Sequence, residues 1–107
     1  MPPCTRFAAF KYKPEITNEQ KKQAYDGLIE LYSKNAHLVN YGPRGGKNNS
    51  TEGFDKGFDV VFTVQFKSVE DRDKFVPNED HVKYKMSVID LVEDVIVYDF
   101  VEGEFGY

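Results

Sequence analysis

The sequence predicts an α+β fold of the ferredoxin-like, split βαβ kind, in which helices cover one face of a four-stranded antiparallel sheet. Three observations carry this prediction: residues 58–66 alternate between apolar and polar side chains, residues 17–20 form a helix-capping sequence, and residues 94–101 are a dense apolar run. With the segments between them, the order along the chain is strand, helix, strand, strand, helix, strand. The 107 residues, 40% of them hydrophobic, suffice for one core and predict a single domain over residues 1–107.

The first strand and the first helix are predicted near the N-terminus. Residues 5–12 are rich in residue types that favour strands, and Pro14 ends that segment. Thr17 and Gln20 have the spacing of a capping box, in which the hydroxyl accepts a backbone N–H of the first turn and the Gln20 side chain reaches back. The helix is expected to extend to about Lys34, with an apolar face made by Ala24, Tyr25, Leu28, Ile29, Leu31 and Tyr32.

A second strand is predicted over residues 37–42, and residues 42–57 are predicted to form a long polar connection. This connection is rich in glycine and contains Arg44 and Lys47, a composition that can cradle a phosphate. It lacks the spacing of a P-loop and no helix follows it directly, so a mobile hairpin loop, able to close over a pocket, is preferred. His37 lies at a helix end, where a cationic side chain suits the dipole, and is interpreted as structural.

The third strand leads into the stretch with the best candidate for chemistry. The even-numbered side chains from Phe58 to Phe66 are apolar and most odd-numbered ones are polar, which predicts a strand with one buried face. Ser68 can cap a short helix, Pro77 ends it, and residues 78–80 can cap the next. His81 falls in the opening turn of that next helix, where the local field favours its neutral, proton-accepting form. His81 is therefore a candidate base; the alternative is an ordinary surface or packing histidine.

The C-terminal part is predicted to contain the last helix and the last strand. Residues 82–92 carry apolar side chains at helical spacing, and residues 94–101 form the final strand. The tail, residues 102–107, is expected to dock on a neighbour or to fray. Apolar residues occur at both odd and even positions of the first and last strands, and they cannot all face helices on one side of the sheet. The exposed apolar face predicts a partner, most simply a second copy in a homodimer.

Composition and charge exclude several classes of partner. A net charge of −4 and a pI near 5.1 argue against nucleic acid or an anionic membrane, because neutralising phosphate needs a basic face. The N-terminus lacks a secretory pattern and no segment approaches the ~20 apolar residues of a membrane span, so a cytoplasmic protein is expected. Cys4 stands alone, which excludes an intramolecular disulfide and a cysteine metal cluster, and is interpreted as an incidental thiol.

The order and spacing of five segments, which together span nearly the whole chain, resemble a stress-responsive A/B barrel (Dabb) domain. These segments are KYKPEIT at residues 11–17, the strand 57–66, KSVE at 67–70, the segment 77–81 and VIVYDF at 95–100. The resemblance implies a dimeric α+β barrel. It also implies a relation to small polyketide cyclases of the olivetolic acid cyclase type and, more remotely, to lyases and decarboxylases with a pocket between sheet and helices.

The resemblance also points to particular site residues. In the cyclase-like members, a histidine that ends a His-Pro-x-His motif works with a tyrosine six residues earlier. His81 occupies the histidine position here, but the tyrosine position is Phe75, which cannot donate a hydrogen bond or carry a proton. By family-like position, Tyr25 and Tyr41 are the candidates to replace that phenol, the alternative for Tyr25 being a core residue. Arg6 stands where many relatives have a histidine.

The pocket implied by the resemblance takes an apolar or aromatic small molecule and has Asp99 turned towards His81. Its walls are expected to be Ala8, Phe10, Leu28, Ile29, Phe62, Phe75, Val92, Val95 and Val97. As an enzyme the protein would need no metal or other cofactor: His81 removes an acidic proton from a phenolic or polyketide-like substrate while Tyr25 or Tyr41 polarises the carbonyl. The alternative is a non-catalytic stress-response or metabolite-binding dimer. A haem-binding monooxygenase of related fold ranks last, because the chain has no Trp.

Overall fold

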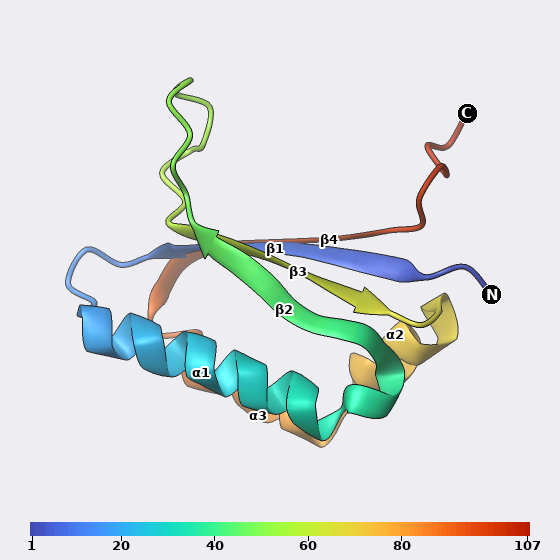
Figure 1. Cartoon of the computed structure of the whole chain (residues 1–107). Coiled ribbons are helices and arrows are strands. Elements are labelled where there is room, and N and C mark those ends of the chain that lie inside the picture. Colours follow the sequence, from blue (N-terminus) through green and yellow to red (C-terminus); the bar gives the residue numbers. More distant parts are fainter.

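The structure, a computed structural model, describes residues 1–107 as a four-stranded antiparallel sheet with three α-helices against one face (Figure 1). The elements are β1 (Cys4–Tyr12), α1 (Asn18–Lys34), a 3-10 turn (Ala36–Leu38), β2 (Val39–Lys47), β3 (Val60–Phe66), α2 (Val69–Phe75), α3 (Glu79–Val88) and β4 (Val92–Phe100). The strands lie in the order β2-β3-β1-β4. The predicted ferredoxin-like α+β fold is confirmed.

Alternation along β1 and β3 determines which side chains face the helices. The even-numbered residues of β1 are buried, and Ala8 among them lies opposite Phe62 of β3. Phe62, Val64 and Phe66 are at most 4% exposed, as the alternation in the sequence predicted. The core therefore lies between this face of the sheet and the helices.

The predicted capping box at the start of α1 is present. The Thr17 hydroxyl accepts the backbone N–H of Gln20 at 3.1 Å, and the side-chain oxygen of Gln20 accepts the backbone N–H of Thr17 at 2.8 Å. Both bonds satisfy donors that have no partner within the helix. The helix ends at Lys34, as expected, and its buried face carries Ala24, Leu28, Leu31 and Tyr32.

β2 differs from the strand predicted over residues 37–42. It begins at Val39, because the residues before it form the 3-10 turn, in which His37 is exposed. It then continues to Lys47, into the segment predicted to be a loop. Backbone groups of glycine and polar residues pair with a neighbouring strand as readily as those of apolar residues, so the side-chain pattern gave no sign of this pairing.

Gly45 permits the close approach of β2 to β3, because a Cβ at this position would lie 2.1 Å from the carbonyl oxygen of Val61. The remaining loop, residues 48–59, is closed by a hydrogen bond of 2.8 Å from the backbone N–H of Asn48 to the carbonyl oxygen of Asp59. Figure 1 shows this loop rising on the side of the sheet away from the helices. It therefore does not close over the space between sheet and helices.

The predicted starts of both helices after β3 are present. The Ser68 hydroxyl accepts the N–H of Asp71 at 3.1 Å at the start of α2. The side-chain oxygen of Asn78 accepts the N–H of Asp80 at 2.8 Å at the start of α3. His81 is the third residue of α3 and so lies in its first turn, as predicted.

α3 packs through a face that apolar residues alone do not define. The helix ends at Val88, so Val92, part of the predicted helical pattern, instead begins β4. The buried residues of α3 are His81 and Val88, whereas Val82 and Met86 are 42% and 66% exposed. Ile89, directly after the helix, is 57% exposed. None of the helices combines the length and the apolar character that crossing a membrane requires.

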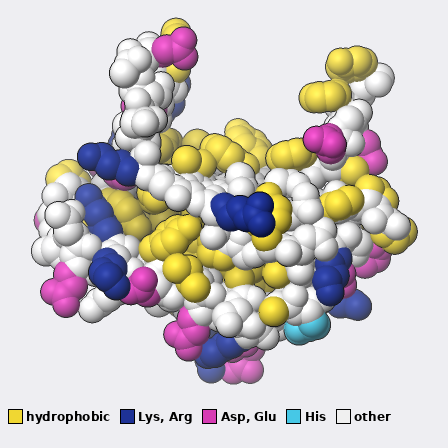
Figure 2. Space-filling view, viewed as in Figure 1, with side chains coloured by type: hydrophobic (Ala, Val, Ile, Leu, Met, Phe, Trp, Pro, Cys, Tyr) yellow, Lys and Arg dark blue, Asp and Glu magenta, His cyan; other side chains and the backbone are white.

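The sheet face away from the helices is uncovered and carries apolar side chains. Phe7 of β1 lies opposite Tyr98 of β4 on this face, and Tyr98 and Phe100 are 67% and 48% exposed. Figure 2 shows hydrophobic side chains along this face, between two segments that rise beside it. These segments are the loop 48–59 and the tail 101–107. The exposed apolar face predicted from the sequence is present.

Candidate functional site

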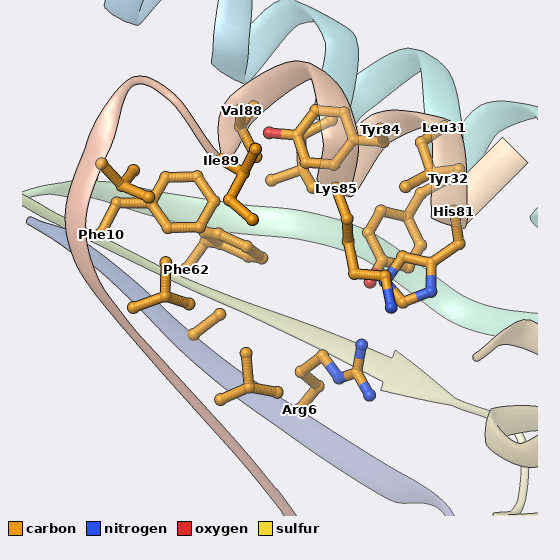
Figure 3. A pocket seen from close by; sticks show the side chains of 15 residues that line it. Arg6, Phe10, Leu31, Tyr32, Phe62, His81, Tyr84, Lys85, Val88 and Ile89 are labelled. Atoms are coloured by element: carbon orange, nitrogen blue, oxygen red, sulfur yellow. The ribbon is translucent and has the colours of Figure 1, made fainter. Parts of the chain in front are cut away.

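A pocket of about 220 Å³ opens between the sheet and the helices α1 and α3 (Figure 3). Side chains from three strands and both helices line it. The lining residues are Arg6, Ala8, Phe10, Leu28, Leu31, Tyr32, Phe62, His81, Tyr84, Lys85, Val88, Ile89, Val92, Val95 and Val97.

The two charged side chains gather at one end of this pocket with His81 and Tyr32. Figure 3 shows Arg6 of β1, Tyr32 of α1, and His81 and Lys85 of α3 around that end, while Phe10 and aliphatic side chains surround the other. The pocket therefore has an apolar compartment and a polar end, which is the usual composition of a small-molecule site.

His81 is oriented so that one ring nitrogen is free. Its Nδ1 lies 2.9 Å from the carbonyl oxygen of Val76, which can only accept, so Nδ1 carries the proton and donates it. Nε2 then carries the lone pair and has no hydrogen-bond partner. No fully enclosed side-chain nitrogen lacks a partner, so Nε2 is accessible, and His81 is one of the residues that line the pocket.

The surroundings of His81 favour its neutral form. Burial lowers the pKa of the imidazole, and the positive charges of Arg6 and Lys85 lower it further, while the hydrogen bond to Val76 acts in the opposite direction. The imidazole is therefore neutral at pH 7 and keeps its lone pair for a proton. The neutral form was predicted from the helix start, but burial is the leading cause.

Phe75 lies behind His81 and outside the pocket lining, contrary to the expected wall position. The ring centroids of Phe75 and His81 are 4.4 Å apart, at an interplanar angle of 33°. Phe75 also stacks on Tyr32, with centroids 4.8 Å apart and an interplanar angle of 14°. Its side chain is fully buried by these neighbours, so it supports His81 and cannot contact a ligand in the pocket.

Tyr32 supplies a phenol at the polar end of the pocket. Burial raises the pKa of Tyr32 to about 12, although the nearby Arg6 acts in the opposite direction. Its hydroxyl therefore stays protonated near neutral pH and can donate a hydrogen bond. Tyr84 also lines the pocket, but its hydroxyl is already donated to the carbonyl oxygen of Ala24 at 2.7 Å.

Asp99 binds two arginines and is not turned towards His81, which corrects the expected orientation. Nε and Nη2 of Arg6 donate to the two carboxylate oxygens at 2.8 and 3.0 Å, and Nη1 of Arg72 donates at 3.1 Å. Burial opposes ionisation of Asp99, but the hydrogen bonds and charges of both arginines outweigh it and lower its pKa. Asp99 does not line the pocket, because its carboxylate is held by the guanidinium groups of Arg6 and Arg72.

Tyr25, Tyr41 and Ile29 do not line the pocket, contrary to expectation. Tyr25 faces a separate polar hollow, with its ring edge-on to Phe62 at 6.4 Å. Tyr41 lies on β2 with the guanidinium of Arg44 at 3.9 Å from its ring centroid, and Ile29 shares a surface hollow with it. On α1, Ile29 lies to one side of the residues that reach the pocket, and Tyr25 lies about two turns before Tyr32, beyond the end of the pocket.

The other predicted wall residues do line the pocket together with His81, namely Ala8, Phe10, Leu28, Phe62, Val92, Val95 and Val97. The lining residues that were not predicted are Arg6, Leu31, Tyr32, Tyr84, Lys85, Val88 and Ile89. The spacing of residues along a helix could have predicted some of these lining residues. Tyr84 and Lys85 lie three and four residues after His81, and Tyr32 lies four after Leu28, so each shares a helix face with a predicted residue.

The pocket thus combines an unprotonated imidazole nitrogen, a phenol, a guanidinium and an ammonium with apolar walls. Such a set can accept a proton and stabilise the negative charge that remains on the substrate. No group of three or more His, Cys, Asp and Glu side chains is arranged to hold a metal ion.

Solved structures share this fold at low sequence identity. A protein from Arabidopsis thaliana is 19% identical, with a TM-score of 0.82 over 91% of this chain and 92% of its own. The hydroxynitrile lyase from Passiflora edulis is 16% identical, with a TM-score of 0.82 over 96% and 95%. A dimeric ferredoxin-like protein of unknown function from Thermobifida fusca is 15% identical, with a TM-score of 0.76 over 94% and 91%. At these identities the likeness shows the fold alone.

Sequence comparison with families gives a more specific result. No curated protein matches the chain. A family model described as the stress responsive A/B barrel domain, Dabb, matches residues 5–102, which include the whole pocket lining. The resemblance seen in the sequence is thereby confirmed, and the chain belongs to the stress-responsive A/B barrel (Dabb) domain family.

Proposed function

We propose that the protein is a cofactor-free enzyme of the cyclase or lyase type, with His81 as general base on a small polyketide-like or phenolic substrate. One observation carries this proposal: His81 lines the pocket as a neutral histidine whose Nε2 is free, because Nδ1–H is committed to Val76. A positioned base of this kind contributes typically ~10² to 10⁴-fold to a rate.

Tyr32 takes the place of the missing phenol in this mechanism, instead of Tyr25 or Tyr41. His81 accepts at Nε2 the proton of an acidic C–H group, whose electron pair moves to the neighbouring carbonyl oxygen. With a hydroxynitrile it accepts the hydroxyl proton instead; the oxygen electron pair then forms the C=O bond, and the C–C bond to the nitrile carbon breaks with its electrons leaving as cyanide. The Tyr32 hydroxyl donates a hydrogen bond to the oxygen on which negative charge develops. The buried setting strengthens this hydrogen bond relative to one in water.

The pocket volume limits the substrate. A cavity of roughly 150 Å³ is known to accommodate benzene. The pocket of about 220 Å³ therefore fits one ring with a short substituent, or a branched chain of similar size. A long polyketide would have to leave part of its chain outside.

The hydroxynitrile lyase among the structural neighbours supports including lyase chemistry. Removal of the hydroxyl proton from a hydroxynitrile gives a carbonyl compound and releases cyanide, so one base is enough for that step. The same base would remove the acidic C–H proton of a β-keto compound before ring closure. Both reactions begin with proton transfer to Nε2 of His81.

The test is turnover by the purified protein of mandelonitrile, followed as benzaldehyde release, and of aromatic β-keto thioesters, followed by mass spectrometry of the cyclised product. We expect turnover of one class that His81→Ala abolishes. His37→Ala is the matched control, because His37 is exposed and lies outside the pocket. Full turnover by His81→Ala would place the base elsewhere.

We further propose that the protein is a homodimer formed through the uncovered sheet face. Face-to-face contact would bury Phe7, Tyr98 and Phe100. The tail that rises beside this face carries Phe105 and Tyr107, 76% and 106% exposed, which a second subunit would also cover. Light scattering should give twice the monomer mass of 12.3 kDa, and a stable monomer would contradict the proposal.

The second candidate function is a non-catalytic stress-response or metabolite-binding dimer. Phe75 favours it, because the position where the cyclase-like members have a tyrosine holds a fully buried phenyl ring behind His81. In that case the pocket would bind a ligand tightly with no conversion. Recovery of an unchanged ligand after prolonged incubation, with His81→Ala altering affinity alone, would decide for this candidate.

A further inference from the structure

The charged residues that line the pocket all have the same sign. Arg6 and Lys85 are both cationic, and no Asp or Glu belongs to the lining. Lys85 is exposed and forms none of the ion pairs of the structure. The polar end of the pocket is therefore positive, although the chain as a whole has a net charge of −4.

Arg6 keeps one edge of its guanidinium for a ligand. Its side edge, Nε and Nη2, is bound to Asp99, and the group has five N–H donors in all. Nη1 does not contact Asp99 and is not fully enclosed, and the Tyr32 hydroxyl lies close enough to interact with the guanidinium, so a ligand at this end of the pocket would meet both groups. The end edge, formed by Nη1 and the second N–H of Nη2, has the geometry that binds a carboxylate through two hydrogen bonds.

Asp99 does not neutralise this site. Its carboxylate is shared between Arg6 and Arg72, so a single negative charge faces two guanidinium groups. Asp73, the other acidic partner of Arg72, has a side chain that is 64% exposed and therefore largely screened by water. The pocket thus retains positive potential at Arg6 and Lys85.

We propose that the ligand of this pocket is a small carboxylic acid, bound as its anion with the carboxylate between Arg6 and Lys85. The apolar body, one ring or a short branched chain, lies against Phe10 and the aliphatic wall at the other end. This inference rests on the proposed function because it assigns the substrate class of the same pocket, but it concerns binding and not turnover.

The arrangement also fits the reaction. Figure 3 shows His81 and Tyr32 at the same end of the pocket as Arg6 and Lys85. Carbon atoms next to the bound carboxylate would therefore lie beside the imidazole, and those further away would lie in the apolar compartment. A β-keto acid or a hydroxy acid with one aromatic ring meets this requirement.

The test compares benzoate with benzamide by isothermal titration calorimetry at low ionic strength. The two molecules have nearly the same shape and differ in charge. Benzoate should bind at least about tenfold more tightly, as expected for hydrogen bonds to a charged group, and its affinity should fall with added salt. Equal affinity for both, or binding of neither, would overturn the proposal.

Lys85→Met and its matched control Lys83→Met locate the anion. Lys83 lies on the same helix with its side chain 73% exposed and pairs with Glu79, outside the pocket. Lys85→Met should weaken benzoate about two- to fivefold and leave benzamide unchanged, while Lys83→Met should change neither. Arg6→Lys keeps the charge but lacks the planar fork and should weaken benzoate by about tenfold or more. Circular dichroism of each variant shows whether it has folded, and folded variants that bind benzoate like the parent would overturn the assignment.

The two proposals fail in distinguishable ways. Selective benzoate binding without turnover of any substrate would leave the anion site standing and remove the enzyme. Turnover that depends on His81, with no preference for benzoate over benzamide, would leave the enzyme and remove the carboxylate.

Discussion

The rings of Phe75 and His81 lie 4.4 Å apart at an interplanar angle of 33°, which places a fully buried phenyl ring directly behind the proposed base. Tyr32 stacks on the same phenyl ring. Phe75 therefore packs against both polar side chains of the proposed mechanism, and the hydrogen bond to Val76 also orients His81. In the proposed mechanism, Tyr32 of α1 would supply the hydroxyl that Phe75 lacks.

Phe75→Ala should destabilise the fold strongly. Phe75 is fully buried against Tyr32, Phe66 and His81, and truncating such a ring leaves a cavity that costs about 3–5 kcal/mol. Urea unfolding measures the change. Phe54→Ala, at a side chain 75% exposed in the loop, is the control and should change the unfolding free energy by less than about 0.5 kcal/mol. Similar losses for both variants would contradict this packing.

Asp99→Asn should be costly because it removes the negative charge beneath Arg6. The Arg6 and Asp99 side chains are 9% and 16% exposed, and breaking a buried ion pair typically costs about 3–5 kcal/mol. Asp73→Asn removes the exposed partner of Arg72 and should cost at most about 1 kcal/mol. Urea unfolding of both variants checks the difference. A small effect at Asp99 would show that the pair is dispensable.

Stability should fall as the pH is lowered through the ordinary pKa of histidine. Above 6.5 His81 is neutral in both folded and unfolded chains. Below it the unfolded chain binds a proton while the folded chain does not, because its pKa is lowered, so the free energy of unfolding declines until the folded pKa is reached. His81→Gln should remove this part of the pH dependence in urea unfolding between about pH 5 and 8. An unchanged slope would mean that His81 titrates normally.

Gly45→Ala should displace β2 from β3. The new Cβ would lie 2.1 Å from the carbonyl oxygen of Val61, and such overpacking costs about 1–3 kcal/mol. Gly46→Ala is a sharp control, because a Cβ at the neighbouring position meets no atom within 4 Å. Thermal unfolding should separate the two variants. Equal stability would show that the strand adjusts at no cost.

Local chemistry made much of the fold predictable. The pair Thr17 and Gln20, the alternation from Phe58 to Phe66 and the cap at Asn78 each determine structure within a few residues, and each is present. The extension of β2 to Lys47 depends on pairing with β3 across irregular register, which no local pattern specifies.

The site was less predictable because it depends on contacts between distant segments. Asp99 lies opposite Arg6 only through the register of β1 with β4, so no local pattern favours this pairing over one with His81. Tyr25 and Tyr32 both lie on the apolar side of α1, but they are about two turns apart along the helix, so only Tyr32 reaches the pocket while Tyr25 reaches a separate hollow.

That selection makes Tyr32→Phe the most direct test of the proposed mechanism. The change removes one hydroxyl and keeps the ring stacked on Phe75, so the unfolding free energy should fall by only about 1 kcal/mol. Turnover should fall by roughly 10²-fold or more, as for the loss of one donor to a developing oxyanion. Tyr25→Phe removes the same group outside the pocket and should leave kcat unchanged. If Tyr25→Phe abolished turnover while Tyr32→Phe did not, the phenol would act from the other hollow, and the reacting group could not lie beside His81 in this pocket.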